Sequence, residues 1–212
     1  LRRASLGLLR ILREYSLTLN LHDLIGESIS LHGNSLTENA TSSEVNTYIL
    51  ERLKGIFSED GISTKLINAV ATVNPSNVVD FENRIAAVDA FSQLAEAENL
   101  AAANKRIQNI LKKTDEQVPV KPDNGLFELE QETSLFEIIT QKENQIEPLL
   151  LNKNYQQILL SLVELKQPID DFFDHVMVMA EDSAVRLNRL SLLQQVHHLF
   201  YKVADISVLQ DS

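Results

Sequence analysis

The strongest chemical signal in the sequence is a basic segment at residues 100–113, which holds four basic side chains and no acid. A helix turns by about 100° per residue, so its polar side chains fall on one side. This polar side consists of Lys105, Arg106, Asn109, Lys112 and Lys113, and the apolar side consists of Leu100, Ala103, Ile107, Ile110 and Leu111. Cations contact phosphates, and an Asn amide can bind a base edge or a ribose. The segment predicts an RNA-binding helix face; the alternative is a solvated face whose cations complement the helix dipole.

Three aspartates near residue 170 have a spacing that can hold magnesium. Asp170, Asp171 and Asp174 follow Pro168, a residue type common in the first turn of a helix. On a helix these carboxylates align and can hold Mg²⁺ against a diphosphate, as in prenyl-chain synthases. Such enzymes also have a second acidic cluster on a facing helix, which this sequence does not supply. The alternative is that the acids stabilise the start of the helix through its dipole.

Two arginines follow an aspartate at helical spacing near residue 185. Asp182 lies four residues before Arg186 and seven before Arg189, on one side of a predicted helix. Arg189 falls among apolar residues and is expected to be partly buried. A buried arginine needs an acidic partner, so we predict an ion pair of Arg189 with Asp182 or with a facing carboxylate. For Arg186 an ion pair and contact with RNA are both open, and we include it among the predicted RNA-binding residues.

The overall charge argues at first against nucleic acid. The 212 residues carry a formal net charge of −11, whereas phosphate binding needs a basic surface. Residues 114–147, however, contain nine acidic and two basic side chains, a local charge of −7. Most of the negative excess lies in this segment, so a basic face can exist elsewhere on the protein.

The composition predicts an all-α fold. Hydrophobic residues make up 44% of the chain, enough for a core, and only six Gly and five Pro interrupt it. Ser42 or Ser43 is expected to cap the third predicted helix, and the Asn74-Pro75 break to separate domains at 1–76 and 80–212. Apolar spacing predicts helices at residues 1–16, 17–36, 44–58, 62–72, from 79 onward, and at 130–151, 154–166, 169–181 and 182–204.

The sequence lacks the residues that several classes of function require. Cysteine is absent, which excludes disulfides, thiolate metal sites and cysteine nucleophiles. No phosphate-cradling glycine loop or catalytic triad signature occurs, so we expect the chain itself not to catalyse a reaction. It has no membrane-length apolar run, and because it begins at Leu1 without Met we expect an internal part of a longer protein.

Several segments, in order along the chain, resemble the beta-subunit family of bacterial glycine–tRNA ligases. They are residues 1–12, residues 100–111 and, above all, residues 168–182 (PIDDFFDHVMVMAED) followed by 186–190 (RLNRL). The resemblance implies a helical connector at 1–76 and a helical-bundle anticodon-binding domain at 80–212. That domain type is shared with arginine–tRNA ligases and named for an Asp-Ala-Leu-Arg motif. The motif is not intact here, and Val88-Asp89-Ala90-Phe91 is its closest stretch, so only the general tRNA-binding role is carried to the helix at 105–113.

The resemblance also implies partners and a setting. The chain would act in a cytoplasmic aminoacyl-tRNA synthetase and bind the anticodon arm of glycine tRNA. It would pair with the remainder of the beta subunit and with a separate alpha subunit, where glycine and ATP react with Mg²⁺, and hold no cofactor itself. The alternative within this family is a scaffold that docks the rest of beta or the alpha subunit.

Overall fold

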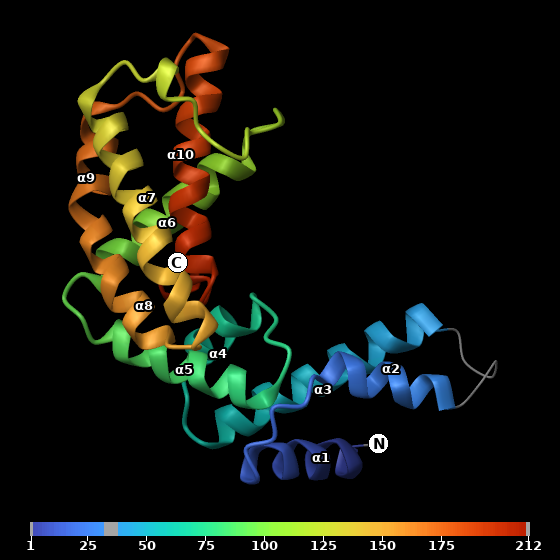
Figure 1. Ribbon diagram of the computed structural model, residues 1–212. Helices are drawn as coiled ribbons and strands as arrows, with labels where there is room; N and C mark the ends of the chain where they lie inside the picture. Colours follow the sequence, from blue (N-terminus) through green and yellow to red (C-terminus); the bar gives the residue numbers. More distant parts are fainter. Residues whose placement is uncertain (1, 32–37, 211–212) are drawn as a thin grey trace. The chain divides into compact units, whose positions relative to one another are not determined.

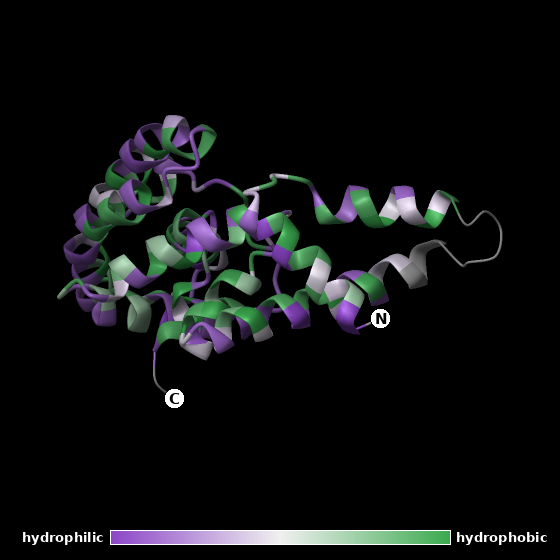
Figure 2. Ribbon diagram, turned by 90° about the horizontal axis from the view of Figure 1, so that it is seen from below, coloured by the Kyte–Doolittle hydropathy of each residue, from purple (hydrophilic) through white to green (hydrophobic). Residues whose placement is uncertain are grey.

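The computed structural model describes residues 2–31 and 38–210, except for the side chains of residues 38–41. Within these ranges the chain forms α-helices and short 3₁₀ helices and no strand, which confirms the predicted all-α fold. Hydrophobic and hydrophilic residues alternate around the helices, as expected where one side of each helix is buried (Figure 2). No helix within the described ranges is long and apolar enough to cross a membrane.

The chain divides into two compact units, Leu1–Ala86 (unit 1) and Ala87–Ser212 (unit 2). The division falls inside helix α5 (Val78–Ser92) rather than in the loop at 74–77, where the sequence predicts it. The two halves of this helix belong to different cores. Phe81 stacks on Phe57 of unit 1, and Phe91 packs against Phe200 of unit 2.

Unit 1 is arranged around the long helix α3. Helix α3 (Glu38–Glu59) packs against α1 (Arg2–Glu14), α2 (Leu21–Leu31) and α4 (Thr64–Ala71). Leu9, Leu53 and Phe57 are buried between these helices. The ring of Phe57 lies 5.2 Å from that of Phe81, centroid to centroid, in a stacked arrangement. Unit 1 is therefore stabilised mainly by apolar packing.

Arg13 makes the polar connection within unit 1. Its guanidinium pairs with Asp60, which follows α3, and its Nε lies 3.0 Å from Oε1 of Glu82 in α5. The same guanidinium lies 5.2 Å from the ring centroid of Phe57. Arg13 thus ties the end of α1 to two other helices from a partly exposed position.

The beginnings of α2 and α3 differ from the prediction. Helix α2 starts at Leu21 rather than at 17, because Ser16 takes a left-handed conformation (φ 49°) that ends α1 and Asn20 accepts a hydrogen bond from the His22 amide. Residues 32–36 of the helix predicted here lie outside the described residues. The predicted cap at Ser42 or Ser43 is wrong, because α3 already begins by Glu38 and both serines lie inside it.

Unit 2 is a bundle in which α8 and α9 follow one another end to end along α7, α10 packs against α7 and α8, and α6 packs on α9 and α10 (Figure 1). Its elements are α6 (Ala97–Lys112), η2 (Asn124–Leu126), α7 (Glu130–Leu151), α8 (Tyr155–Leu162), η3 (Val163–Leu165), α9 (Lys166–His175), α10 (Ser183–Tyr201) and η4 (Ile206–Leu209). The pattern predicted as one long helix from 79 is two helices, because turns at 93–96 separate α5 from α6.

Helix α9 ends earlier than predicted. It stops at His175, and Val176 is extended (φ −105°, ψ 119°), whereas the sequence predicts a helix to 181. Residues 176–182 form a connection to α10 whose carbonyl groups bind two arginines of α10, as described below. These hydrogen bonds stabilise the extended backbone in place of further helical turns.

Candidate nucleic-acid interface

The basic side of α6 is exposed on the surface of unit 2. Its five predicted residues, Lys105, Arg106, Asn109, Lys112 and Lys113, are all exposed. We call these five residues the α6 face. Helix α6 is held from behind by α9, α10 and η4, and Nε2 of Gln108 donates to Oδ1 of Asp205 at 2.8 Å. The packing therefore fixes the direction in which the α6 face points.

The buried side of α6 differs in part from the predicted one. Leu100 and Ile107 are buried as predicted, whereas Ala103, Ile110 and Leu111 are only half-buried. Asn104 is buried, and its Nδ2 donates to the carbonyl of Leu100 at 3.1 Å. The packed side extends to Asn104 because α6 also contacts η4, which contributes a third neighbouring element.

One cation of the α6 face is positioned by an aromatic ring. The guanidinium carbon of Arg106 lies 3.9 Å from the ring centroid of Phe173 in α9. This distance is typical of a guanidinium lying over an aromatic ring. The contact restricts the conformations of the Arg106 side chain, although Arg106 is exposed to solvent. The opposite surface of a held guanidinium plane can stack with a nucleobase. Neither the ring nor its role follows from the spacing of residues in α6.

Arg186, the sixth predicted RNA-binding residue, is half-buried and already bound by other groups. Its Nη2 pairs with Oε1 of Glu116 at 2.8 Å, and its Nη1 donates to the carbonyls of Ala180 and Glu181 at 2.9 and 3.3 Å. These contacts hold the connection between α9 and α10. The structure thus gives Arg186 a structural role, and contact with RNA stays a prediction.

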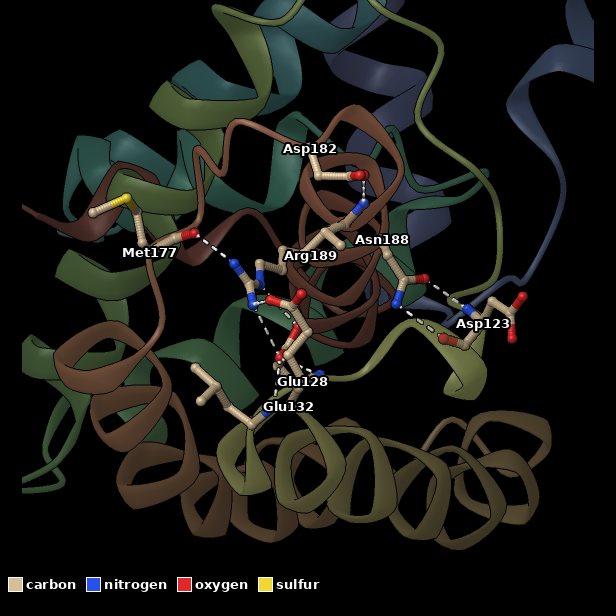
Figure 3. Close-up of polar contacts among 9 residues, drawn as sticks. Asp123, Glu128, Glu132, Met177, Asp182, Asn188 and Arg189 are labelled. Atoms are coloured by element: carbon tan, nitrogen blue, oxygen red, sulfur yellow. Dashed lines mark hydrogen bonds and ion pairs between the residues drawn. The ribbon is translucent and has the colours of Figure 1, made fainter.

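Arg189 is the centre of a buried ionic network (Figure 3). Its Nε lies 2.9 Å from Oε1 of Glu132, its Nη2 lies 2.9 Å from Oε2 of Glu128, and its Nη1 donates to the carbonyl of Met177 at 3.1 Å. Glu132 is completely buried and also accepts from the amides of Glu128 and Leu129. The hydrogen bond to Glu132 raises the pKa of the Arg189 guanidinium. The network joins α7, α10 and the 176–182 connection.

The facing carboxylate predicted for Arg189 is therefore confirmed, and the pair with Asp182 is wrong. Asp182 instead caps α10, where its Oδ1 accepts from the amides of Ala184 and Val185 at 2.8 and 3.0 Å. Aspartate is favoured at the position immediately before a helix, because its side chain accepts hydrogen bonds from amides that have no partner within the helix.

Two of the three aspartates of α9 have separate partners. Oδ2 of Asp170 pairs with Nζ of Lys166 at 2.9 Å, and Oδ1 of Asp171 accepts from Nε2 of Gln167 at 2.8 Å. In the part of the chain that the structure describes, no group of three or more acidic or histidine side chains is arranged to hold a metal ion. The arrangement gives no support to a diphosphate site.

The α6 face lies within a region of known type. Residues 100–207 match the family model described as the DALR anticodon binding domain. This match covers half of the chain, and the chain therefore belongs to the family of DALR anticodon-binding domains. Residues 1–72 match a second family model, described as the glycyl-tRNA synthetase beta subunit.

Close relatives carry the same description over almost the whole chain. The protein is 45% identical over 210 residues to a glycine–tRNA ligase beta subunit of Colwellia psychrerythraea, and 42% and 45% identical to those of Vibrio parahaemolyticus and Vibrio cholerae. Each comparison covers 99% of this chain and 30% of the relative. The chain thus spans about a third of the length of these relatives, and its predicted resemblance to the beta-subunit family is confirmed.

Proposed function

We propose that this chain binds the anticodon arm of glycine tRNA and contributes that contact to an ATP-dependent glycine–tRNA ligase. The observation that carries the proposal is the coincidence of the DALR match, residues 100–207, with the exposed cations of the α6 face. The relatives support glycine as the amino acid, since each is described as a glycine–tRNA ligase beta subunit. In this proposal, a separate alpha subunit carries out the reaction of glycine with ATP and Mg²⁺ in the cytoplasm.

The chemistry of the α6 face fits single-stranded RNA. Lys105, Lys112 and Lys113 supply mobile ammonium groups for phosphates, which give affinity with little sequence preference. Arg106, held by Phe173, offers a flat guanidinium for a base that has left its stack. Asn109 adds an amide that can bind a base edge or a 2′-hydroxyl.

Titration of the chain with glycine tRNA at several salt concentrations tests this proposal. The double variant Lys105→Glu/Lys112→Glu is expected to bind at least about tenfold more weakly, with a flatter dependence of log K on log salt. Lys65→Glu is the control for a single charge reversal and is compared with Lys105→Glu alone, because Lys65 is exposed in the first turn of α4, where an acidic residue suits the helix dipole. Unchanged binding by the double variant, or no salt-dependent binding by the parent chain, would contradict the proposal.

A docking role for unit 1 is the second candidate, and the surface of α1 favours it. Ile11 and Tyr15 of α1 are 52% and 68% exposed. Leu8 of the same helix lines an apolar pocket of about 640 Å³ together with Val45 and Tyr48 of α3 and other residues. Exposed apolar patches of this kind mark interaction surfaces. The candidate partner is the remainder of a beta subunit. Capture of that remainder by the parent chain, lost in Ile11→Glu/Tyr15→Glu, would support docking, and equal capture by the variant would exclude this surface.

A further inference from the structure

A second concave surface lies on unit 2, between the stretch 120–121 and the C-terminal turns of α10. The cavity has a volume of about 340 Å³. Its lining includes Val120, Lys121, Gln195, His198, Tyr201 and Lys202. Lys121, His198 and Lys202 are exposed, and Gln195 and Tyr201 are half-buried. A cavity of this size accommodates one nucleotide unit rather than a whole base pair.

The wall of this pocket is fixed before any ligand binds. Asn188 of α10 accepts from the amide of Asp123 at 2.6 Å and donates to the carbonyl of the same residue at 3.0 Å (Figure 3). About two turns of α10 further on, the side-chain amide of Gln195 approaches the carbonyl of Val120, N to O 3.5 Å. These contacts hold the 120–123 stretch against α10, so binding costs little ordering of the chain.

The lining has the chemistry of a phosphate site. Lys121 and Lys202 present two ammonium groups, and His198 adds a ring nitrogen. Glu143 is the acidic member of the lining, so the two lysines outweigh it by one charge. Phosphate is the part of a nucleotide that exposed ammonium groups bind.

The pocket adjoins the α6 face. Helices α6 and α10 pack together, and Gln108 is bonded to Asp205, just beyond the end of α10. The ring of His197 lies 5.2 Å from that of Tyr201, which lines the pocket. Burial lowers the pKa of the His197 imidazole, and the charge of Asp205 opposes this shift. The α6 face and the pocket thus belong to helices that pack against each other.

We propose that the pocket lined by Lys121 and Lys202 binds one phosphate of the RNA that the α6 face binds. The two lysines contact the phosphate, and Gln195 holds the wall that carries Lys121. This inference rests on the proposed function, and it extends the RNA contact from α6 to the C-terminal end of α10.

Binding of glycine tRNA to the 212-residue chain tests the charges of the pocket in both directions. Lys121→Gln/Lys202→Gln is expected to weaken binding about tenfold and to flatten the salt dependence by roughly 0.7 to 0.9 per lost phosphate contact. Glu143→Gln is expected to strengthen binding, a change that damage to the fold would not produce. Lys65→Gln serves as the control for loss of one positive charge in unit 1. If both pocket variants bind as this control does while the α6 double variant binds weakly, the pocket is excluded and the proposed function stands.

A phosphate-by-phosphate comparison identifies the contact itself. Synthetic anticodon arms of glycine tRNA, each with one phosphate replaced by a neutral methylphosphonate, are titrated with the parent chain and with Lys121→Gln/Lys202→Gln. At one position the replacement should weaken binding to the parent about tenfold and leave binding to the variant unchanged. Equal losses in parent and variant at every position would overturn the proposal.

Discussion

The two units connect their helices by different kinds of interaction. In unit 2, buried ions join separate elements: Arg189 of α10 binds Glu132 of α7, and Lys142 of α7 binds Glu164 of η3. Glu132, Lys142 and Arg189 are 0%, 1% and 4% exposed. Among the described residues of unit 1, Arg13 makes ion pairs with Asp60 and Glu82, which lie outside its own helix and are both 41% exposed.

One well-covered ion pair among the described residues of unit 1 lies within a single helix. Arg84 and Asp80 are well covered, but both belong to α5 and lie one helical turn apart. Such a pair supports its own helix and does not determine which helices pack together. The comparison indicates that apolar packing specifies unit 1, whereas unit 2 also depends on matching buried charges between α7, α10 and η3.

Loss of Glu132 should produce the largest effect. Glu132→Ala leaves the buried guanidinium of Arg189 without its main partner and frees two backbone amides, so the free energy of unfolding should fall by about 3–5 kcal/mol. Urea denaturation measures the loss, and amide exchange should locate it in unit 2. Glu128→Ala is the control, because Glu128 is 60% exposed and should cost about 1 kcal/mol or less. Equal losses from the two variants would break the comparison.

The Lys142 pair should respond unequally to removal of its two members. Glu164→Ala leaves the buried ammonium of Lys142 with Gln145 alone and should destabilise unit 2 by about 1–3 kcal/mol. Lys142→Met removes the buried charge and returns Glu164, which is 64% exposed, to water. Its effect should lie within about 1 kcal/mol of zero. The thermal unfolding midpoints of the two variants test this order. A larger loss of stability for Lys142→Met than for Glu164→Ala would show that the buried charge itself is stabilising.

The smallest effect is expected in unit 1. Asp60→Asn removes the charge opposite Arg13 but keeps a hydrogen-bonding side chain at a partly exposed site, so the loss should be about 1 kcal/mol or less. Salt should reduce it further because exposed pairs are screened. Unfolding measured at low and high salt tests this expectation. Lys54→Gln, which removes the exposed pair of Lys54 with Glu51, serves as a comparison. A loss comparable to that of Glu132→Ala would remove the distinction between the units.

Helical spacing predicted much of this structure because it depends only on neighbouring residues. It identified most of the helices but not all of their ends, and it identified the exposure of Lys105, Arg106 and Lys112 and the need of Arg189 for an acid. It did not identify Glu132 as that acid, since 57 positions separate the two residues and Asp182 is closer in sequence.

The contacts of the candidate site were the least predictable. Phe173 reaches Arg106 only because α9 packs beside α6, and the pocket at Lys121 exists only because Asn188 holds a distant loop. The end of α9 was missed for a related reason. Val176 to Asp182 have side chains compatible with a helix, and carbonyl contacts to Arg186 and Arg189 favour the extended form.

The division inside α5 has a practical consequence for truncation. A polypeptide that ends at residue 76, where proline and asparagine mark a boundary in the sequence, loses Phe81 and Glu82. Phe57 would then expose one ring surface to water, and Arg13 would keep only Asp60. A shortened unit 1 that extends through residue 86 retains both partners, so the choice of end point decides whether it expresses as a folded protein or aggregates.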